Sequence, residues 1–264
     1  MITILILNTS RRDPPRGSLG RHGRGSYPSG SMTTQDLLAL HRRLFTAYGP
    51  QDWWPGGDDP FEVIVGAILT QRCSWTNASL AIEALRRDGL LAPKPLRRAP
   101  IGEVAARIRP ALFYNEKAKK LRAFVGRLHR SWDDDLDRFL SQPMDRLRAE
   151  LLGIHGIGEE TADAILLYAA GKPSFVIDAY TRRLLSRLGW IDGRERYAVL
   201  RDRFMTELPN DSVLFNEYHA LVVEHGKTRC RVKPDCGGCP LADWCTMDLA
   251  CRRSDGSGAT RGPG

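Results

Sequence analysis

Four cysteines close to the end of the 264-residue chain constrain its fold more than any other feature. Cys230, Cys236, Cys239 and Cys245 are spaced C-x5-C-x2-C-x5-C, so one short loop can wrap four thiolates around a compact metal centre. Secreted disulfide proteins instead scatter their cysteines through the fold. Four thiolates suit either zinc or a [4Fe–4S] cluster, and the spacing alone leaves both open.

The composition is that of a globular protein with an excess of basic residues. The 39 Lys and Arg exceed the 31 Asp and Glu by 8, but most of this excess lies in residues 1–31 and 252–264, so charge alone is weak evidence for a polyanionic partner. A hydrophobic content of 42% excludes a wholly disordered chain. No apolar run approaches the ~20 residues of a transmembrane helix, and the first residues, MITILILNTSRR, lack the basic start and cleavage site of a signal peptide. We therefore expect a cytoplasmic protein with no membrane partner.

The chain between its two ends has a helical pattern almost throughout. Residues 1–31 and 252–264 are rich in Arg, Gly and Ser, hold little to bury, and predict a disordered basic extension and a disordered tail. No sustained period-two alternation occurs, so we expect an all-α fold. Apolar spacing predicts helices from Thr33 or Thr34 to about Tyr48 and over 60–70, 75–88, 101–108, 116–129, 144–152, 159–170, 179–188, 195–207 and 212–225.

The segment LLGIHGIGEETADAILLYAAGKPSFVIDAYTRRLL, residues 151–185, has the densest pattern. A predicted helix ends at Gly153, Gly156 and Gly158 bracket a tight turn, and a new helix starts at Glu159. Glycines permit backbone conformations closed to other residues and leave amide N–H groups bare at a helix start, so such a turn can hold a phosphate. On its own, G-x-G is also a common connection between two helices.

The surroundings of this turn resemble the helix-hairpin-helix and Gly/Pro–Asp region of the endonuclease III superfamily of DNA glycosylases. One helix follows the turn, then a loop with Gly171 and Pro173, and then Asp178 opens the next helix. Three further segments resemble the family in the expected order: DPFEVIVGAILTQRCSW (59–75), FYNEKAKKL (113–121) and the cysteine loop (230–245). The resemblance covers about 33–250 and implies a two-lobe, all-α helix-hairpin-helix DNA glycosylase fold with a C-terminal iron–sulfur cluster loop.

The resemblance also implies the domains, the cofactor and the partner. A helical domain with the hairpin is expected over 52–172, and a second lobe, formed by 32–51 plus 173–251, holds a [4Fe–4S] cluster on the four cysteines. The first gap of the cysteine loop is one residue shorter than in typical endonuclease III. Double-stranded DNA with a damaged base is the expected partner of a monomeric protein, which in a bacterium is associated with the nucleoid.

Asp178 is the candidate catalytic residue. Breaking an N-glycosidic bond gives the sugar oxocarbenium character, and a fixed carboxylate stabilises that charge or orients the attacking water. As the N-cap of a helix, Asp178 would also be held in place. By resemblance, Gln71 enters the gap left by the flipped nucleotide, where its amide can donate and accept hydrogen bonds. The same resemblance assigns DNA contacts to Gly156, Gly158, Thr161 and Lys117, although Lys117 also fits a solvated helix face.

Glu160 separates this chain from bifunctional endonuclease III. That enzyme has the pattern G-x-G-x-K-T-A, whereas residues 156–162 read GIGEETA here, with Glu160 at the lysine position. A carboxylate cannot form the Schiff base that drives β-elimination. Glu160 is therefore the second residue that we place at the catalytic centre, and the chain resembles the monofunctional 3-methyladenine glycosylase III-like branch.

Three tryptophans near Gln71 predict a base pocket. Trp53 and Trp54 precede the glutamine helix, and Trp75 follows it. Alkylation of a purine ring nitrogen makes the base cationic, weakens its glycosidic bond and favours stacking on indole, although core filling explains at least one tryptophan equally well.

The sequence therefore predicts a DNA glycosylase of base excision repair that flips a damaged base and hydrolyses its N-glycosidic bond, acting on alkylated purines with absent or weak AP lyase activity. Two alternatives stay open. One is a bifunctional glycosylase/AP lyase that acts on oxidised pyrimidines. The other is a protein that binds lesions or DNA structures without turnover.

Overall fold

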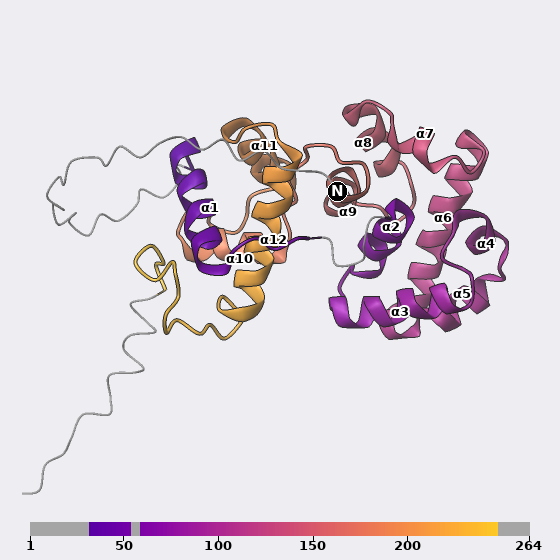
Figure 1. Cartoon of the computed structure of the whole chain (residues 1–264), viewed down its shortest axis with the longest axis horizontal. Coiled ribbons are helices and arrows are strands. Elements are labelled where there is room, and N and C mark those ends of the chain that lie inside the picture. Colours follow the sequence, from indigo (N-terminus) through magenta and orange to yellow (C-terminus); the bar gives the residue numbers. More distant parts are fainter. Residues whose placement is uncertain (1–31, 54–58, 248–264) are drawn as a thin grey trace, which may run out of the picture.

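The computed structural model describes residues 32–53 and 59–247, which form an all-helical fold (Figure 1). The predicted disordered segments 1–31 and 252–264, and Trp54, lie outside the described residues. The elements are α1 (Thr34–Tyr48), α2 (Pro60–Leu69), α3 (Trp75–Arg87), α4 (Pro93–Arg98), α5 (Ile101–Arg107), the 3-10 helix η1 (Arg109–Ala111), α6 (Tyr114–Trp132), α7 (Leu136–Leu140), α8 (Met144–Leu152), α9 (Glu159–Ala164), the π-helix η2 (Ile165–Ala169), α10 (Ala179–Arg187), α11 (Tyr197–Glu207) and α12 (Ser212–Thr228).

The all-α prediction is confirmed, and each helix expected from apolar spacing is present. The short helices α4 and α7 were not predicted, because six and five residues do not complete two turns of a repeating pattern. The single helix expected over 159–170 is α9 followed directly by the π-helix. Among the helices of the described ranges, none combines the length and apolar character needed to cross a membrane.

The apolar side chains form two separate clusters. The first is built from residues between Phe61 and Leu166, on α2–α9 and the start of the π-helix. The second combines Met32 and residues of α1 with residues between Leu167 and Leu241. Figure 1 accordingly shows α1, α10, α11 and α12 on one side of the molecule and α2–α9 on the other. The lobe boundaries expected from the resemblance remain a proposal that this division supports.

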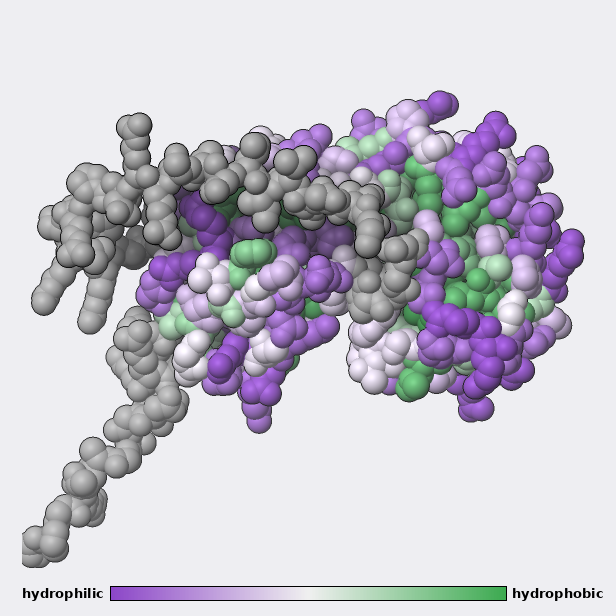
Figure 2. Space-filling model, viewed as in Figure 1, coloured by the Kyte–Doolittle hydropathy of each residue, from purple (hydrophilic) through white to green (hydrophobic). Residues whose placement is uncertain are grey.

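Helix α1 belongs with the C-terminal part of the chain. The Tyr218 hydroxyl on α12 donates a hydrogen bond of 2.8 Å to the carbonyl of Leu37 on α1, and both residues are buried in the second cluster. On the surface, hydrophilic residues dominate the outer rim of the face in Figure 2, whereas hydrophobic residues show between them on the half formed by α2–α6.

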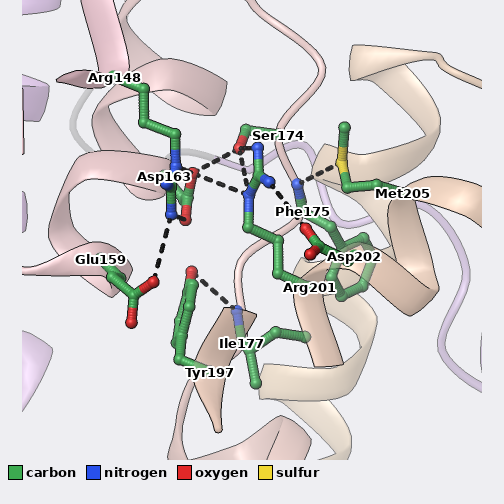
Figure 3. Close-up of polar contacts among 10 residues, drawn as sticks. All are labelled: Arg148, Glu159, Asp163, Ser174, Phe175, Ile177, Tyr197, Arg201, Asp202 and Met205. Carbon is green, nitrogen blue, oxygen red and sulfur yellow. Dashed lines mark hydrogen bonds and ion pairs between the residues drawn. The ribbon is translucent and has the colours of Figure 1, made fainter. Parts of the chain in front are cut away.

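A buried group of polar side chains connects the two halves (Figure 3). Asp163 on α9 is fully buried and accepts hydrogen bonds from Arg148 on α8 (2.8 and 3.0 Å), Arg201 on α11 (3.1 Å) and the Ser174 hydroxyl (2.6 Å). A buried charge is costly unless it is paired and hydrogen-bonded, and both carboxylate oxygens meet this condition. The network fixes the loop that leads from the π-helix to Asp178.

The hairpin turn has the predicted position, between α8 and α9. Gly156 has a φ of 85°, and a Cβ atom added there would lie 2.3 Å from the Lys120 side chain, so glycine is required. Gly158 instead has an extended conformation that any residue can adopt, with a φ of −93°. Helix α9 begins at Glu159, as predicted.

Candidate active site

A cavity of about 860 Å³ brings together residues from both clusters and from distant parts of the sequence. Its wall comes from the segment after α2, from α9 and the π-helix, from the start of α10, from α12 and from the beginning of the cysteine loop. Six residues predicted from the sequence line it: Trp53, Gln71, Trp75, Glu160, Thr161 and Asp178. The cavity is therefore the candidate active site.

Asp178 is the N-cap of α10, as its position before AYTRRLL suggested. Its Oδ1 accepts hydrogen bonds from the backbone N–H (2.7 Å) and the hydroxyl (2.9 Å) of Thr181. Its Oδ2 lies 3.6 Å from Nε2 of His219, and the side chain is 14% exposed, toward the cavity. Burial alone would raise the pKa of Asp178, but the neighbouring His219 imidazole and the two Thr181 donors outweigh it and hold the pKa below its ordinary value. Asp178 is thus a fixed, ionised carboxylate.

His219 and Tyr168 are the residues of this site that the sequence did not reveal. The Tyr168 hydroxyl lies 2.5 Å from Nδ1 of His219. Burial, together with the charge of Asp178, raises the pKa of Tyr168 well above its ordinary value, so the phenol keeps its proton and donates it to Nδ1. We therefore assign the imidazole hydrogen to Nε2, which faces Asp178. Tyr168 lies in the π-helix, and no sequence pattern links it to a histidine 51 residues away.

Glu160 is the second carboxylate of the cavity. Desolvation by the surrounding protein raises its pKa, and the negative charge of Asp178 raises it further, while His219 and Arg182 act in the opposite direction. The two carboxylates therefore differ: Asp178 loses its proton readily, and Glu160 keeps its proton to a higher pH. Environments that separate two carboxylates in this way are typical of acid–base pairs.

Gln71 lies between the cavity and a neighbouring groove that Gly156, Gly158 and Thr161 also line. Its Nε2 donates to the carbonyl of Gly156 (3.0 Å) and to the Thr161 hydroxyl (2.9 Å), and its Oε1 accepts from Lys120. All five predicted DNA-contacting residues, Lys117 included, line this groove. The amide of Gln71 is fully hydrogen-bonded within the protein, so entering a DNA duplex requires it to exchange these partners.

Lys117 also lines the groove, but its side chain does not lie on a solvated helix face. The side chain is only 2% exposed, and its Nζ donates to the carbonyls of Leu69 (2.8 Å) and Ala111. Burial lowers the pKa of Lys117. The reason is the register of α6, which begins at Tyr114 and places Lys117 on its buried face rather than on the solvated one.

Phe113 is an exposed aromatic residue to which sequence reasoning gave no role. It lines the same groove as Gln71, is 62% exposed, and follows Leu112, which is also exposed. Both residues have left-handed backbones, with φ values of 55° for Leu112 and 46° for Phe113. Strained, exposed apolar residues at the edge of a groove are candidates for contact with a ligand.

The two described tryptophans differ in their surroundings. Trp75 is the first residue of α3, lines the cavity and also packs against the first hydrophobic cluster, so it combines core filling with a wall position. Trp53 carries the ammonium of Lys227 on its ring, 5.0 Å from the ring centroid. Trp54, the third predicted pocket residue, lies outside the described residues.

A second cavity is lined by all four cysteines of the C-terminal loop, Cys230, Cys236, Cys239 and Cys245. Burial raises the pKa of Cys239, and the charges of Cys245 and Cys230, which line the same cavity, raise it further. Arg187 lines the cavity and donates a hydrogen bond of 3.1 Å to Sγ of Cys230. Four thiols that line one cavity beside a fixed guanidinium fit a [4Fe–4S] cluster in chemistry, since the cluster's ligands carry negative charge.

Residues 65–210 match the model of the HhH-GPD superfamily base excision DNA repair protein, and residues 231–245 match the iron–sulfur binding domain of endonuclease III. The chain is 43% identical over 216 residues to a Methanocaldococcus jannaschii protein named for DNA repair glycosylase activity, covering 79% of this chain and 95% of that protein.

Two solved structures are similar to this fold. One is an endonuclease III–DNA covalent intermediate, with a TM-score of 0.73, 20% identity, and coverage of 84% of this chain and 100% of that chain. The other is the Helicobacter pylori 3-methyladenine DNA glycosylase MagIII bound to 1,N6-ethenoadenine, with a TM-score of 0.63, 27% identity, and coverage of 74% and 96%.

Proposed function

The chain belongs to the HhH-GPD superfamily of base excision DNA repair proteins, and we propose that this DNA glycosylase removes a damaged base by hydrolysis alone. The helix-hairpin-helix glycosylase fold and the [4Fe–4S] cofactor are those expected from the sequence. The cluster, when bound, fixes the C-terminal loop on its four cysteines. The observation that supports hydrolysis most directly is that Asp178 and Glu160 line one cavity, with a carboxylate at the position of the lyase lysine.

Hydrolysis needs charge stabilisation but no covalent amine. In this proposal the ionised Asp178 faces the sugar as its C1′–N bond breaks and stabilises the oxocarbenium character of the transition state. Thr181 fixes one carboxylate oxygen and His219 orients the other, so the charge is in place before the substrate binds. His219 acts through Asp178 and is a positioning residue.

Double-stranded DNA with a damaged base is the proposed substrate, bound along the groove of Gly156, Gly158 and Thr161. The hairpin supplies bare N–H groups to a phosphate. Gln71 lines both this groove and the cavity, and Phe113 lines the groove. In this proposal the two side chains fill the space that a flipped nucleotide leaves in the duplex.

The walls of the cavity suit a flat base. Trp53 and Trp75 line the cavity, and these aromatic side chains support a purine as the damaged base. The similarity to MagIII, whose structure contains 1,N6-ethenoadenine, supports the same class.

One observation favours the bifunctional alternative. Among the described residues, Lys227 is the only lysine that lines the cavity, so it offers an amine to an abasic sugar. Its ammonium rests on Trp53, and hydrolysis needs no such amine. Substitution of Lys227 can therefore distinguish the hydrolytic function from the bifunctional alternative.

The test is base release combined with borohydride trapping. We expect wild-type protein to release a damaged base, leave intact abasic sites and form no trapped adduct. A trapped adduct that disappears in Lys227→Met would support the bifunctional alternative. Asp178→Asn should release no base while it still binds abasic DNA, and a wild-type protein that binds such DNA but releases no base from any damaged duplex would support the non-catalytic alternative.

A further inference from the structure

The proposed active-site cavity carries more positive than negative charge. Two acidic side chains line it, Asp178 and Glu160, against four basic ones, Arg72, Arg183, Lys227 and Arg231. The ion pairs found within residues 32–53 and 59–247 include none of these four cations. A base that enters the cavity therefore meets a net positive wall.

Part of this charge is rigidly placed. Arg183 donates from Nε to the carbonyl of Cys230 (2.7 Å) and from Nη2 to the carbonyl of Gly226 (3.1 Å). Carbonyl oxygens orient a guanidinium without cancelling its charge. The positive potential is thus a fixed property of the wall and not only of mobile side chains.

The indole face that suits a cationic base is already covered by a cation. The ammonium of Lys227 lies 5.0 Å from the centroid of the Trp53 ring, within the range of a cation–π interaction. A cationic base stacked on Trp53 would have to displace this ammonium or approach a like charge. An uncharged base can share the ring without that repulsion.

The same charges favour an uncharged leaving group. An uncharged base accepts the electron pair of the broken C1′–N bond and develops negative charge, which nearby cations stabilise in the transition state. A cationic base becomes neutral as it leaves, so the cations give it no such stabilisation. The protein thus has charge of the sign that the more difficult leaving group needs.

Resting on the proposed hydrolytic function, we propose that the cavity selects damaged bases that are uncharged in the duplex and discriminates against cationic N-alkylpurines. In the reaction, the water oxygen bonds to C1′ while the C1′–N bond breaks, and its electron pair passes to the base. Glu160 gives its proton to the base and later regains one from solvent, while the water proton passes to Asp178 and then to solvent. Among alkylated purines, the uncharged adducts remain substrates.

The experiment compares three duplexes that contain uracil, 1,N6-ethenoadenine or 7-methylguanine. The rate of single-turnover base release is divided by the rate of spontaneous loss of the same base, because cationic bases are intrinsically labile. This ratio is the enhancement. We expect the enhancement for at least one uncharged base to exceed that for 7-methylguanine by at least about tenfold, given the strength of charge interactions in a partly desolvated site. The two uncharged probes distinguish a pyrimidine from a purine substrate.

Charge variants test the cause. Lys227→Met should raise 7-methylguanine release relative to the uncharged base by about tenfold, and Arg231→Gln, a change at an exposed residue, should act in the same direction. Lys94→Met, the same change on exposed α4 away from the cavity, is the control. A larger enhancement for 7-methylguanine in the wild type, or an equal effect of both charge variants on all three bases, would overturn the inference. Release of no base from any duplex would instead contradict the hydrolytic function itself.

Discussion

Asp178 and Glu160 share a cavity, yet their surroundings move their pKa values in opposite directions. The pKa of Asp178 is lowered, mainly because His219 and Thr181 outweigh its burial, and the pKa of Glu160 is raised by desolvation and by Asp178. Base release should fall at low pH as Asp178 gains a proton, and at high pH as Glu160 loses its proton. Base release should therefore be fastest at pH values above the lowered pKa of Asp178 and below the raised pKa of Glu160.

His219→Gln tests this assignment. Removing the imidazole removes one of the interactions that lower the pKa of Asp178, so the acid limb should move to higher pH. The alkaline limb, which reports Glu160, should also move to higher pH, because His219 lowers the pKa of Glu160 as well. Arg182 continues to lower that pKa in the variant. The measurement is the pH profile of single-turnover base release, with His129→Gln on α6 as the control. An unchanged acid limb would show that His219 has only a packing role.

At the scale of single elements, the hairpin turn depends on one glycine. Gly156→Ala places a Cβ in a left-handed backbone and against Lys120, which should cost about 1–2 kcal/mol in the free energy of unfolding. DNA affinity should fall as well, since Lys120 holds Gln71 and the shifted turn breaks that contact. Gly102→Ala on α5 is the matched control, because its Cβ meets nothing within 4 Å. Urea unfolding and fluorescence anisotropy measure the two effects, and equal results for both variants would contradict the argument.

The same scale shows what a sequence can predict. Apolar spacing and glycine positions located the long helices, the hairpin and the N-cap role of Asp178, because these depend on neighbouring residues. The solvated helix face considered for Lys117 was wrong, because the apolar residues around it set the register of its helix and bury its side chain. The π-helix that brings Tyr168 to His219 was not predictable, because that contact depends on tertiary packing between distant segments.

Across the whole molecule, α10 connects the candidate active site to the cysteine loop. Asp178 caps its first turn, Arg183 in its middle donates to the carbonyl of Cys230, and Arg187 at its end donates to the Sγ of Cys230. A change in the cysteine loop should therefore reach the carboxylate through one helix. The sequence placed Asp178 and the cysteines in the same lobe only through family resemblance, because no local pattern links them.

Cys236→Ser tests this connection. Loss of one of four thiolates should release iron, unfold the cysteine loop and its lobe, and abolish base release. Wild-type protein purified without oxygen should hold about four irons per chain. Cys73→Ser, outside the loop, should retain its iron, as should Cys251→Ser at a position outside the described residues. Iron content and thermal unfolding measure the outcome, and stoichiometric zinc in the wild type would contradict it.

The position of α1 has a consequence for how the chain is made. The first hydrophobic cluster lies within one uninterrupted stretch, Phe61–Leu166, and can close as soon as that stretch leaves the ribosome. Helix α1 emerges earlier, but Leu37, Leu40 and Leu44 pack with residues that begin only at Leu167. The apolar face of α1 therefore stays exposed while more than a hundred further residues are synthesised. During translation, the first hydrophobic cluster, which contains the hairpin, can therefore form before the second one.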